Sequence, residues 1–317
     1  MPDFASTDQR LQRARQSLEG LSVGDAFGDR YFTLSDTSAG PLRSLIARRA
    51  ELAAPWWYTD DTEMALSVYA VLAECGGIDP DRLAWSFAER YDPGRGYGAA
   101  MHGLLADIRQ GQPWQGAASA LFGGQGSYGN GAAMRVAPLG AYFADDLDAV
   151  VEHAARSAAV THSHPEGIAG AVAVALAAAW AARSREAGER PSRRELLERV
   201  RERTPDSEVR EKLRHAWSLE PGCSVELAAM ALGNGSRISA QDTVPFCLWS
   251  AGERLDHYEE ALWLTVSALG DRDTTCAIVG GIVAAYTGAE AIPERWLRKR
   301  EPLPDWPFES SSRPGSP

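Results

Sequence analysis

The stretch DRDTTCAIVGGIVAAY, residues 271–286, joins an acidic cluster directly to an apolar segment of helical length. Acidic and hydroxyl side chains favour the first turn of a helix, so Asp271 and Asp273 are expected at a helix start. The apolar part contains Gly280-Gly281, and each glycine costs a helix about 1 kcal/mol relative to alanine. That cost is justified where another backbone approaches closely. We therefore expect a tightly packed central helix that carries carboxylates at its beginning.

A second acidic cluster, residues 59–62 (Thr-Asp-Asp-Thr), also precedes an apolar run of helical length. Taken alone it is typical of a helix cap, and Asp60 with Glu63 could form a capping pair. Two consecutive aspartates cannot both cap one helix, however, so one must point elsewhere. If the two helix starts meet, four carboxylates share a small volume and repel one another unless a cation lies between them.

The types of ligand select the metal. Carboxylate and hydroxyl oxygens without cysteine or histidine suit Mg²⁺ or Mn²⁺. Two such ions, about 3.5–4 Å apart, could orient a polyhydroxylated substrate and activate water. The paired clusters therefore predict a metal-dependent enzyme.

Helical patterns dominate the rest of the chain, and strand signals are scarce. The segment Ile168–Ala182 is apolar on all sides, which indicates a buried helix. The candidate helices cover residues 8–26, 62–75, 80–91, 97–109, 130–143, 147–159, 165–183, 192–203, 207–218, 224–232, 241–252, 257–268 and 274–287. We expect an all-α fold with one domain over residues 1–300 and a Pro- and Ser-rich tail, loosely docked or disordered, over 301–317.

Composition excludes several classes of protein. The chain has 317 residues, 44% of them hydrophobic, which is ample for a large core. Its net charge of −11 disfavours non-specific binding of nucleic acid. The four cysteines form no CxxC pair, which argues against a zinc site or a disulfide framework. The polar N-terminus lacks a signal-peptide core, and no apolar run reaches membrane-spanning length. We expect a cytoplasmic monomer that does not bind membranes.

Three Gly-rich segments accompany the acidic clusters: residues 20–28, 126–131 and 233–235. Glycine allows backbone N–H groups to approach a phosphate, although a single segment of this kind is more often a turn. The segment 126–131 is the stronger candidate because it also offers Ser127, Tyr128 and Asn130. It has no Walker lysine, so it is not a P-loop.

Two histidines, His162 and His164, precede the most apolar helix. One of them should be placed by packing or helix capping. The alternative is a histidine that lies beside a phosphate or a ribose.

Taken together, these segments resemble the ADP-ribosylglycohydrolase family in order along residues 15–295, and the combined pattern is highly specific. The Arg-Gly-Tyr-Gly, Gly-Ser-Tyr-Gly-Asn-Gly and Leu-Gly-Asn-Gly pieces look closest to the type 3 ADP-ribosyl-acceptor hydrolase branch. The matching segments are residues 24–28, 58–64, 95–98, 126–135, 161–162, 244–245 and 270–274.

The resemblance implies an orthogonal bundle of helices with a binuclear Mg²⁺ or Mn²⁺ site. By matching positions, Phe122 and Tyr128 would sandwich the adenine. The metal ligands would be Thr59, Asp60, Asp61, Asp271, Asp273 and Thr274. The diphosphate and riboses would contact Gly98, Gly126, Ser127, Gly129, Asn130 and His162.

One position departs from the type 3 pattern. Where that branch has a glutamate thought to act near the scissile bond, this chain has Phe32. Asp25 and Asp29 are nearby, but neither stands at the motif position. The departure leaves the acceptor open and favours N-linked substrates slightly, because a basic nitrogen leaves with less help than a serine alkoxide.

The expected activity is therefore that of an ADP-ribosyl glycohydrolase with two bound Mg²⁺ or Mn²⁺ ions. A metal-bound water, oriented by Asp60 or Asp61, would attack the anomeric carbon of the distal ribose and release ADP-ribose from its acceptor. Two alternatives stay open. One is a non-catalytic ADP-ribose binder or structural protein on the same fold, and the other is a hydrolase of a free O-acyl-ADP-ribose.

Overall fold

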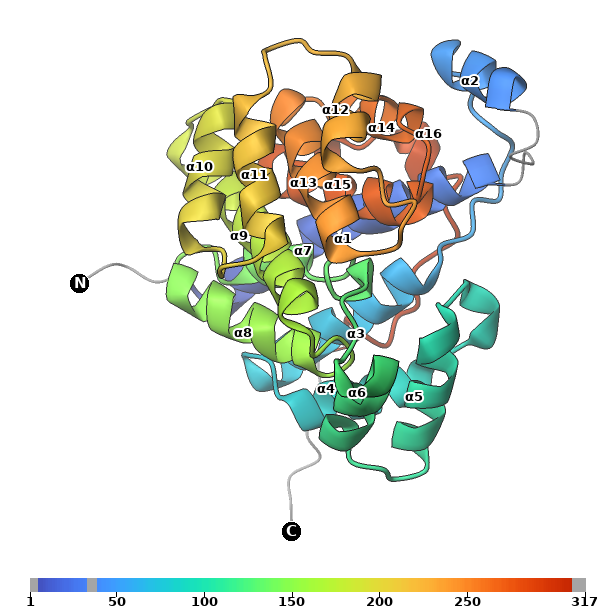
Figure 1. Cartoon of the computed structure of the whole chain (residues 1–317), viewed down its shortest axis with the longest axis vertical. Helices are drawn as coiled ribbons and strands as arrows, with labels where there is room; N and C mark the ends of the chain where they lie inside the picture. The colour runs from blue at the N-terminus through green and yellow to red at the C-terminus, as the bar shows by residue number, and fades with distance from the viewer. Residues whose placement is uncertain (1–4, 33–38, 310–317) are drawn as a thin grey trace.

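The computed structural model describes residues 5–32 and 39–309, and every regular element in that part of the chain is helical (Figure 1). The predicted all-α class is therefore confirmed. The α-helices are α1 (Thr7–Asp29), α2 (Ala39–Ala47), α3 (Asp60–Cys75), α4 (Pro80–Arg90), α5 (Ala99–Arg109), α6 (Trp114–Gly124), α7 (Ala137–Tyr142), α8 (Leu147–Ala159), α9 (Pro165–Ala187), α10 (Arg193–Arg203), α11 (Glu208–Ser218), α12 (Val225–Leu232), α13 (Ala240–Glu253), α14 (Tyr258–Ser267), α15 (Arg272–Thr287) and α16 (Glu294–Leu297). Single turns of 3₁₀-helix cover Arg30–Phe32, Pro93–Arg95, Asn130–Ala132 and Ala289–Ala291.

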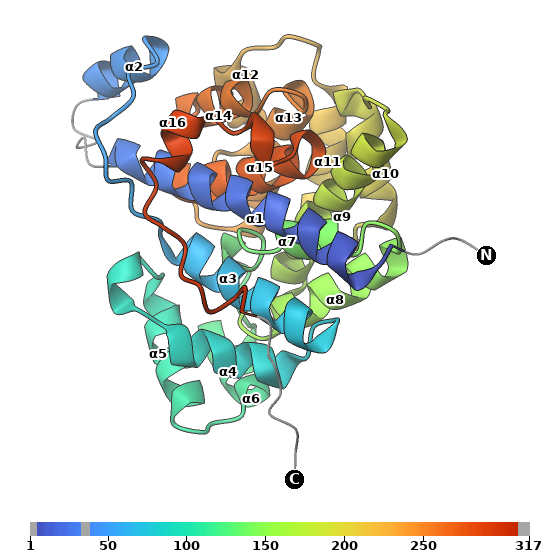
Figure 2. The same ribbon diagram turned by 180° about the vertical axis from the view of Figure 1, so that it is seen from behind.

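Helices α1 and α15 form the most extensive helix pair and cross the middle of the molecule. Seen from behind, α1 runs diagonally over α15 and α7, with α3 below it (Figure 2). Helices α4, α5 and α6 gather at one end of the molecule, whereas α10 to α14 surround the other end in both views.

Glycines allow the backbones of α1 and α15 to touch. A Cβ on Gly24 would lie 2.2 Å from the carbonyl oxygen of Cys276, and a Cβ on Gly280 would lie 2.3 Å from that of Gly20. Gly28 makes the same kind of approach to the carbonyl oxygen of Arg272. The close backbone approach predicted for Gly280 is therefore confirmed. The interpretation of residues 20–28 as a phosphate-type loop is wrong, because these glycines lie within α1 and serve helix packing.

The apolar helix α9 occupies the core, as its composition predicts. It is long and apolar enough to cross a membrane by length and composition, yet 78% of its most apolar stretch is buried inside the protein. Ala171, Val174 and Ala178 are among its fully buried residues. Burial in the protein therefore accounts for its apolar surface.

Most expected helices are present with ends displaced by a few residues, but one region was predicted wrongly. Residues 130–143 form a 3₁₀ turn and the short helix α7 rather than one helix, and Pro138 stands in the first turn of α7. Three helices were not predicted: α2, α6 and the single turn α16 (Glu294–Leu297). Helix α2 contains Gly40-Pro41, and α6 contains three glycines and has no side-chain cap, so both lack the usual signals of a helix.

The first part of the expected tail packs against the helices. The guanidinium of Arg90 lies 4.4 Å from the centroid of the Trp306 ring, and the rings of Phe308 and Tyr69 are 5.2 Å apart in an edge-on arrangement. Residues 310–317 lie outside the described part of the chain. A separate tail therefore stays a prediction for those residues.

Replacing Gly24 by alanine is expected to lower the free energy of unfolding by about 1–3 kcal/mol, because the added methyl meets the α15 backbone, which cannot move aside locally. Gly103→Ala in α5 is the matched control, since a Cβ there has open space around it. The control should raise stability by up to about 1 kcal/mol through helix propensity. Chemical denaturation of both variants tests this, and a Gly24→Ala protein as stable as the control would contradict it.

The acid stability of the protein should depend on Glu51. This carboxylate accepts hydrogen bonds from Lys299 (2.6 Å), Trp296 (2.8 Å) and Arg295 (2.7 Å). Partial burial raises the pKa of Glu51, but these hydrogen bonds outweigh it and lower the pKa to about 2. The stabilisation is therefore complete above the ordinary pKa of about 4.5 and is lost as the pH falls towards 2. The stability difference between wild type and Glu51→Gln should be smaller at pH 3.5 than at pH 7, and an unchanged difference would refute this.

Candidate active site

The two acidic clusters meet, because the first turns of α3 and α15 face each other beside α1. The carboxylates of Asp60, Asp271 and Asp273 all act on Asp61. Asp61 is 1% exposed, and burial followed by the nearby negative charges of Asp25 and these three groups raises its pKa well above the ordinary value. The four carboxylates that the sequence singled out thus share one small volume.

A fifth carboxylate, Asp25, lies at the centre of the cluster and was not predicted. It is fully buried in α1, between the glycines that contact α15. Its oxygens accept hydrogen bonds from the N–H groups of Thr59 (3.0 Å) and Thr62 (3.1 Å) and from both hydroxyls. Asp25 therefore holds the start of α3. The sequence signals were an aspartate between two glycines and its place in the segment 24–28 that resembles the family.

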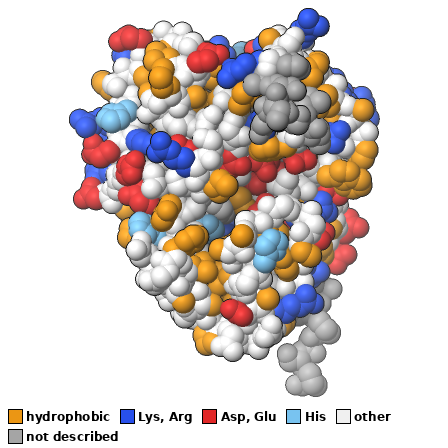
Figure 3. Space-filling model, turned by 45° about the vertical axis from the view of Figure 1, so that its right-hand side comes forward, with side chains coloured by type: hydrophobic (Ala, Val, Ile, Leu, Met, Phe, Trp, Pro, Cys, Tyr) orange, Lys and Arg blue, Asp and Glu red, His pale blue; other side chains and the backbone are white. Residues whose placement is uncertain are grey.

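Burial and mutual repulsion set the electrostatics of the cluster. Burial, together with the charges of Asp25 and Asp271, raises the pKa of Asp60 to about 8. Burial raises the pKa of Asp25 to about 6, although four hydrogen bonds oppose it. The pKa values of Asp271 and Asp273 are also raised, mainly by burial. Figure 3 shows acidic side chains gathered in a hollow across the middle of one face.

The helix-capping interpretation does not account for the aspartates. Thr59 is the N-cap residue of α3, and Asp271 is that of α15 without a capping hydrogen bond from its side chain. Asp60 lines the cavity described below, whereas Asp61 is buried with its Oδ1 atom unpartnered. Glu63 bonds the Tyr97 hydroxyl instead of forming a capping pair with Asp60.

A cavity of about 760 Å³ opens beside the cluster. Eleven of the predicted site residues line it: Asp60, Gly98, Phe122, Ser127, Tyr128, Gly129, Asn130, His162, Asp271, Asp273 and Thr274. Thr59, Asp61 and Gly126 lie behind its wall rather than on it. The remaining lining residues, Met64, Gly96, Ala99, Ala100, Met101, Gly131, Met134, Arg237 and Ile238, were not predicted.

The loop 126–131 folds around His162. A Cβ on Gly131 would come within 3.0 Å of the imidazole, and one on Gly129 within 3.2 Å of its Nε2 atom. The Nδ1 atom of His162 is 2.7 Å from the Thr161 hydroxyl. His164 instead caps α9 by accepting a hydrogen bond from the N–H of Glu166 (3.1 Å). The capping role expected of one histidine is therefore filled by His164, and a phosphate or ribose contact for His162 stays a prediction.

The aromatic pair stands at the rim of the cavity. Phe122 and Tyr128 are 56% and 42% exposed, and their ring centroids are 6.1 Å apart at 34°. A base between two rings needs about 7 Å, since each carbon contact is about 3.5 Å. The rings must therefore separate slightly to sandwich an adenine. Phe122 has φ +53°, a backbone conformation that non-glycine residues rarely adopt.

Asn130 joins the loop to the acidic cluster. Its amide group donates to Asp271 Oδ2 (2.7 Å) and to the Thr243 hydroxyl (3.0 Å). The side chain predicted to contact the nucleotide thus also orients a predicted metal ligand.

Comparison with known proteins shows which family the chain belongs to. A family model described as ADP-ribosylglycohydrolase matches residues 6–310. The chain belongs to the ADP-ribosylglycohydrolase family. It is 30% identical to ADP-ribosylhydrolase ARH3 of Homo sapiens, over 92% of this chain and 90% of the human one, and 25% identical to ADP-ribosylarginine hydrolase Tri1 of Pseudomonas putida, over 92% and 75%. A solved structure described as an ADP-ribosylglycohydrolase-related protein complex matches with a TM-score of 0.64 at 26% identity, over 93% of this chain and 94% of that one. The family predicted from the motifs is confirmed.

Position 32, where the chain departs from the type 3 motif, lies beside this family's acidic cluster. The Phe32 side chain is 38% exposed. Its ring covers the guanidinium of Arg272, whose central carbon lies 4.0 Å from the centroid of the Phe32 ring. Arg272 itself stands between Asp271 and Asp273. Asp29, considered above as a substitute acid, does not line the cavity. Phe32 has no acidic group, and Asp29 does not line the cavity, so neither residue takes the place of the glutamate as an acid beside the substrate.

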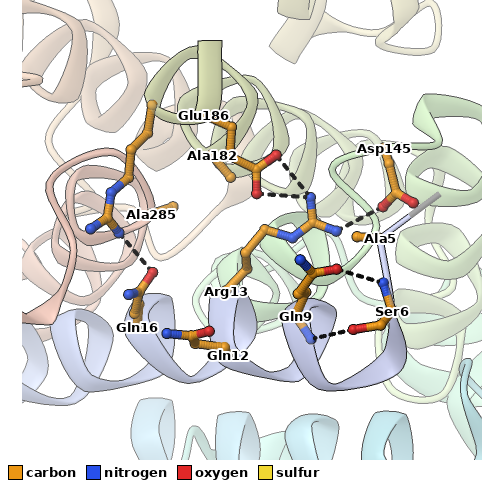
Figure 4. A pocket seen from close by; sticks show the side chains of 11 residues that line it. Ala5, Ser6, Gln9, Gln12, Arg13, Gln16, Asp145, Ala182, Glu186 and Ala285 are labelled. Carbon is orange, nitrogen blue, oxygen red and sulfur yellow. Dashed lines mark hydrogen bonds and ion pairs between the residues drawn. The ribbon is translucent and has the colours of Figure 1, made fainter. Parts of the chain in front are cut away.

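A second hollow, of about 790 Å³, is lined by the first half of α1, the C-terminal ends of α9 and α15, and Asp145 in the turn after α7 (Figure 4). Its cations are already paired. Arg13 donates to Asp145 (2.8 Å) and Glu186 (3.4 Å), and Arg185 donates to Gln16 (2.7 Å). The cavity beside the acidic cluster is therefore the candidate active site.

His162 is expected to stay neutral throughout the physiological pH range. Burial, followed by the nearby charge of Arg135, lowers its pKa to about 3. The folded state therefore binds fewer protons than the unfolded state between pH 6.5 and 3, and stability falls as the pH decreases through that window. In NMR spectra the His162 ring should keep neutral-imidazole shifts from pH 8 to 5, and a midpoint near 6.5 would disprove this.

Proposed function

We propose that this chain hydrolyses the glycosidic bond between the distal ribose of ADP-ribose and an acceptor. One observation carries the proposal: a single cavity has an aromatic pair and a glycine loop at one end and a carboxylate cluster at the other. The aromatic rings suit a nucleobase. The backbone N–H groups of the loop and the start of α5 suit a diphosphate, and the carboxylates suit ribose hydroxyls.

The residues at the acidic end fit a pair of Mg²⁺ or Mn²⁺ ions. The donors are all oxygens, which these ions prefer. Asp61 Oδ1 is buried without a hydrogen-bond partner, as a waiting ligand atom would be. In residues 5–32 and 39–309 no three His, Cys, Asp or Glu side chains form a ready-made metal group as they stand. Binding would therefore draw in the predicted hydroxyls and rotate carboxylates. The ligands would be Thr59, Asp60, Asp61, Asp271, Asp273 and Thr274.

When bound, the ions would polarise the ribose hydroxyls and acidify a water molecule. The chain supplies the remaining functions. Asp60 is the member of the Asp60–Asp61 pair that reaches the cavity, so we assign it the role of base. It takes one proton from the attacking water while the new C–O bond forms and the acceptor bond breaks. The departing acceptor takes a proton from solvent or keeps one that it already carries.

The acceptor follows from position 32. With phenylalanine there, a leaving group that carries its own proton has an advantage. We therefore propose a guanidinium-type nitrogen, as in ADP-ribosylarginine, before a serine oxygen. The name of the Pseudomonas putida relative, an ADP-ribosylarginine hydrolase, agrees with this choice.

A substrate panel tests the proposal. ADP-ribose released from arginine-, serine- and base-linked substrates is measured by chromatography with Mg²⁺ and with a chelator. We expect release that requires metal and is fastest from arginine. Asp60→Asn should lower the rate by about 10²-fold or more, whereas Asp107→Asn, the same change at an exposed position of α5, should leave it unchanged. Full activity in chelator would refute the metal requirement.

Phe32 also favours a second candidate, a protein that binds ADP-ribose without hydrolysing it. Calorimetry with ADP-ribose, read together with the substrate panel, separates the two. A binder takes up ADP-ribose but releases none from any substrate at any enzyme concentration, including a free O-acyl-ADP-ribose. Turnover of that metabolite alone would instead assign the third activity considered from the sequence.

A further inference from the structure

Residues 298–309, which we call the strap, run beside the segment that leads into the first acidic cluster. The N–H of Trp56 donates to the Lys299 carbonyl (2.7 Å), and the N–H of Glu301 donates to the Trp56 carbonyl (2.9 Å). These bonds make a short parallel bridge between Trp56 and Arg300. The strap thus reaches the chain three residues before Thr59.

Glu301 uses this position to hold two groups. Its Oε1 atom accepts a hydrogen bond from the N–H of Tyr58 (2.9 Å) and another from Arg95, whose second nitrogen is 3.3 Å from Oε2. Arg95 in turn donates to the Tyr58 carbonyl (2.9 Å), and its guanidinium lies 4.1 Å from the centroid of the Tyr58 ring. The side chains of Glu301 and Arg95 are only 11% and 20% exposed. Glu301 therefore holds the backbone N–H of Tyr58, and Arg95 holds its carbonyl.

The two segments that Glu301 joins both lead to the cavity. Tyr58 directly precedes Thr59 and Asp60, and Arg95 directly precedes Gly96, which lines the cavity together with Gly98. Glu63 makes a second connection between the same segments, because it accepts a hydrogen bond from the Tyr97 hydroxyl (2.7 Å) and lies 4.0 Å from Arg95. Arg95 is thus shared by three carboxylates: Glu63 of α3, Glu301 of the strap and Asp92 of its own segment, which lies 3.6 Å away.

We propose that Glu301 is a positioning residue that sets the spacing between the acidic cluster and the 96–98 wall through Arg95. The two-pronged arginine–carboxylate pair fixes direction as well as distance. A displacement of about 1 Å in reacting groups can lower a rate about 10²-fold. The role in turnover rests on the proposed function, but the spacing also governs how the cavity holds ADP-ribose.

Variants at Glu301 test this role. Glu301→Ala removes both contacts and should lower kcat/KM at least about 10-fold, with most of the loss in kcat, because Asp60 is misplaced for the reaction. Glu301→Gln keeps an acceptor for the Tyr58 N–H but loses the charge that holds Arg95, so it should fall between wild type and Glu301→Ala. The double variant Glu301→Ala/Arg95→Ala should lose less activity than the two single losses multiplied together, since both single variants break the same Arg95–Glu301 pair.

Two control variants separate positioning from simple loosening. Phe308→Ala loosens the same strap at its contacts with Tyr69 and Arg15, seven residues after Glu301 in the sequence. Glu294→Gln makes the same chemical change as Glu301→Gln at a carboxylate that is 81% exposed. Both should keep wild-type kcat and KM at temperatures well below the unfolding midpoint.

The outcomes are distinct. If Glu301→Ala is destabilised as much as Phe308→Ala but has the same kcat and KM as that control, the proposal is overturned. If wild type releases no ADP-ribose from any substrate, the proposed function fails, and calorimetry with ADP-ribose still decides the spacing role. Several-fold weaker binding by Glu301→Ala than by Phe308→Ala supports that role, and equal binding overturns it.

Discussion

The backbone contact between α1 and α15 is the constraint on which the rest of the structure depends. Gly20, Gly24 and Gly28 let the backbone of α1 touch that of α15, and Gly280 leaves the matching space on α15. Tyr258 strengthens the contact by donating to the Gly20 carbonyl (2.6 Å). Because the helices touch at this level, Asp25 is carried inward beside the start of α15. Through its hydrogen bonds to Thr59 and Thr62, Asp25 then fixes the start of α3.

This packing buries five carboxylates close together, an arrangement that does not favour the stability of the folded chain. Burial raises the pKa of all five carboxylates, and neighbouring negative charges raise it further for Asp60, Asp61 and Asp273, so the charged forms are disfavoured in the folded chain. Hydrogen bonds offset only part of this penalty, and one oxygen of Asp61 has no partner. Local rules of stability are commonly broken at functional sites, where the surrounding fold compensates. The dense α1–α15–α9 core is such a compensation.

The features that could be predicted from the sequence are local ones. Apolar periodicity predicted α8 at its observed bounds and the buried α9, and crowded acidic side chains predicted the two helix starts at the site. The features that could not be predicted have a weak local signal or none. Helix α6 is rich in glycine, and Pro138 is only a weak sign that the helical pattern over 130–143 breaks before α7. Asp25 is one of four carboxylates in α1, and its position in the cluster depends on helix packing. The docking of residues 301–309 was likewise invisible, because their composition is that of a loose tail.

By itself, the sequence determined the chemical groups of the site and the helices that carry them, since both follow from residue types and their spacing within one turn or two. Only the tertiary structure decided which aspartate faces the cavity, that Asn130 bonds Asp271, and that Glu301 reaches the cluster through Arg95. These relations join residues far apart in the chain, at distances set by the packing of whole helices. No local pattern encodes a distance of that kind.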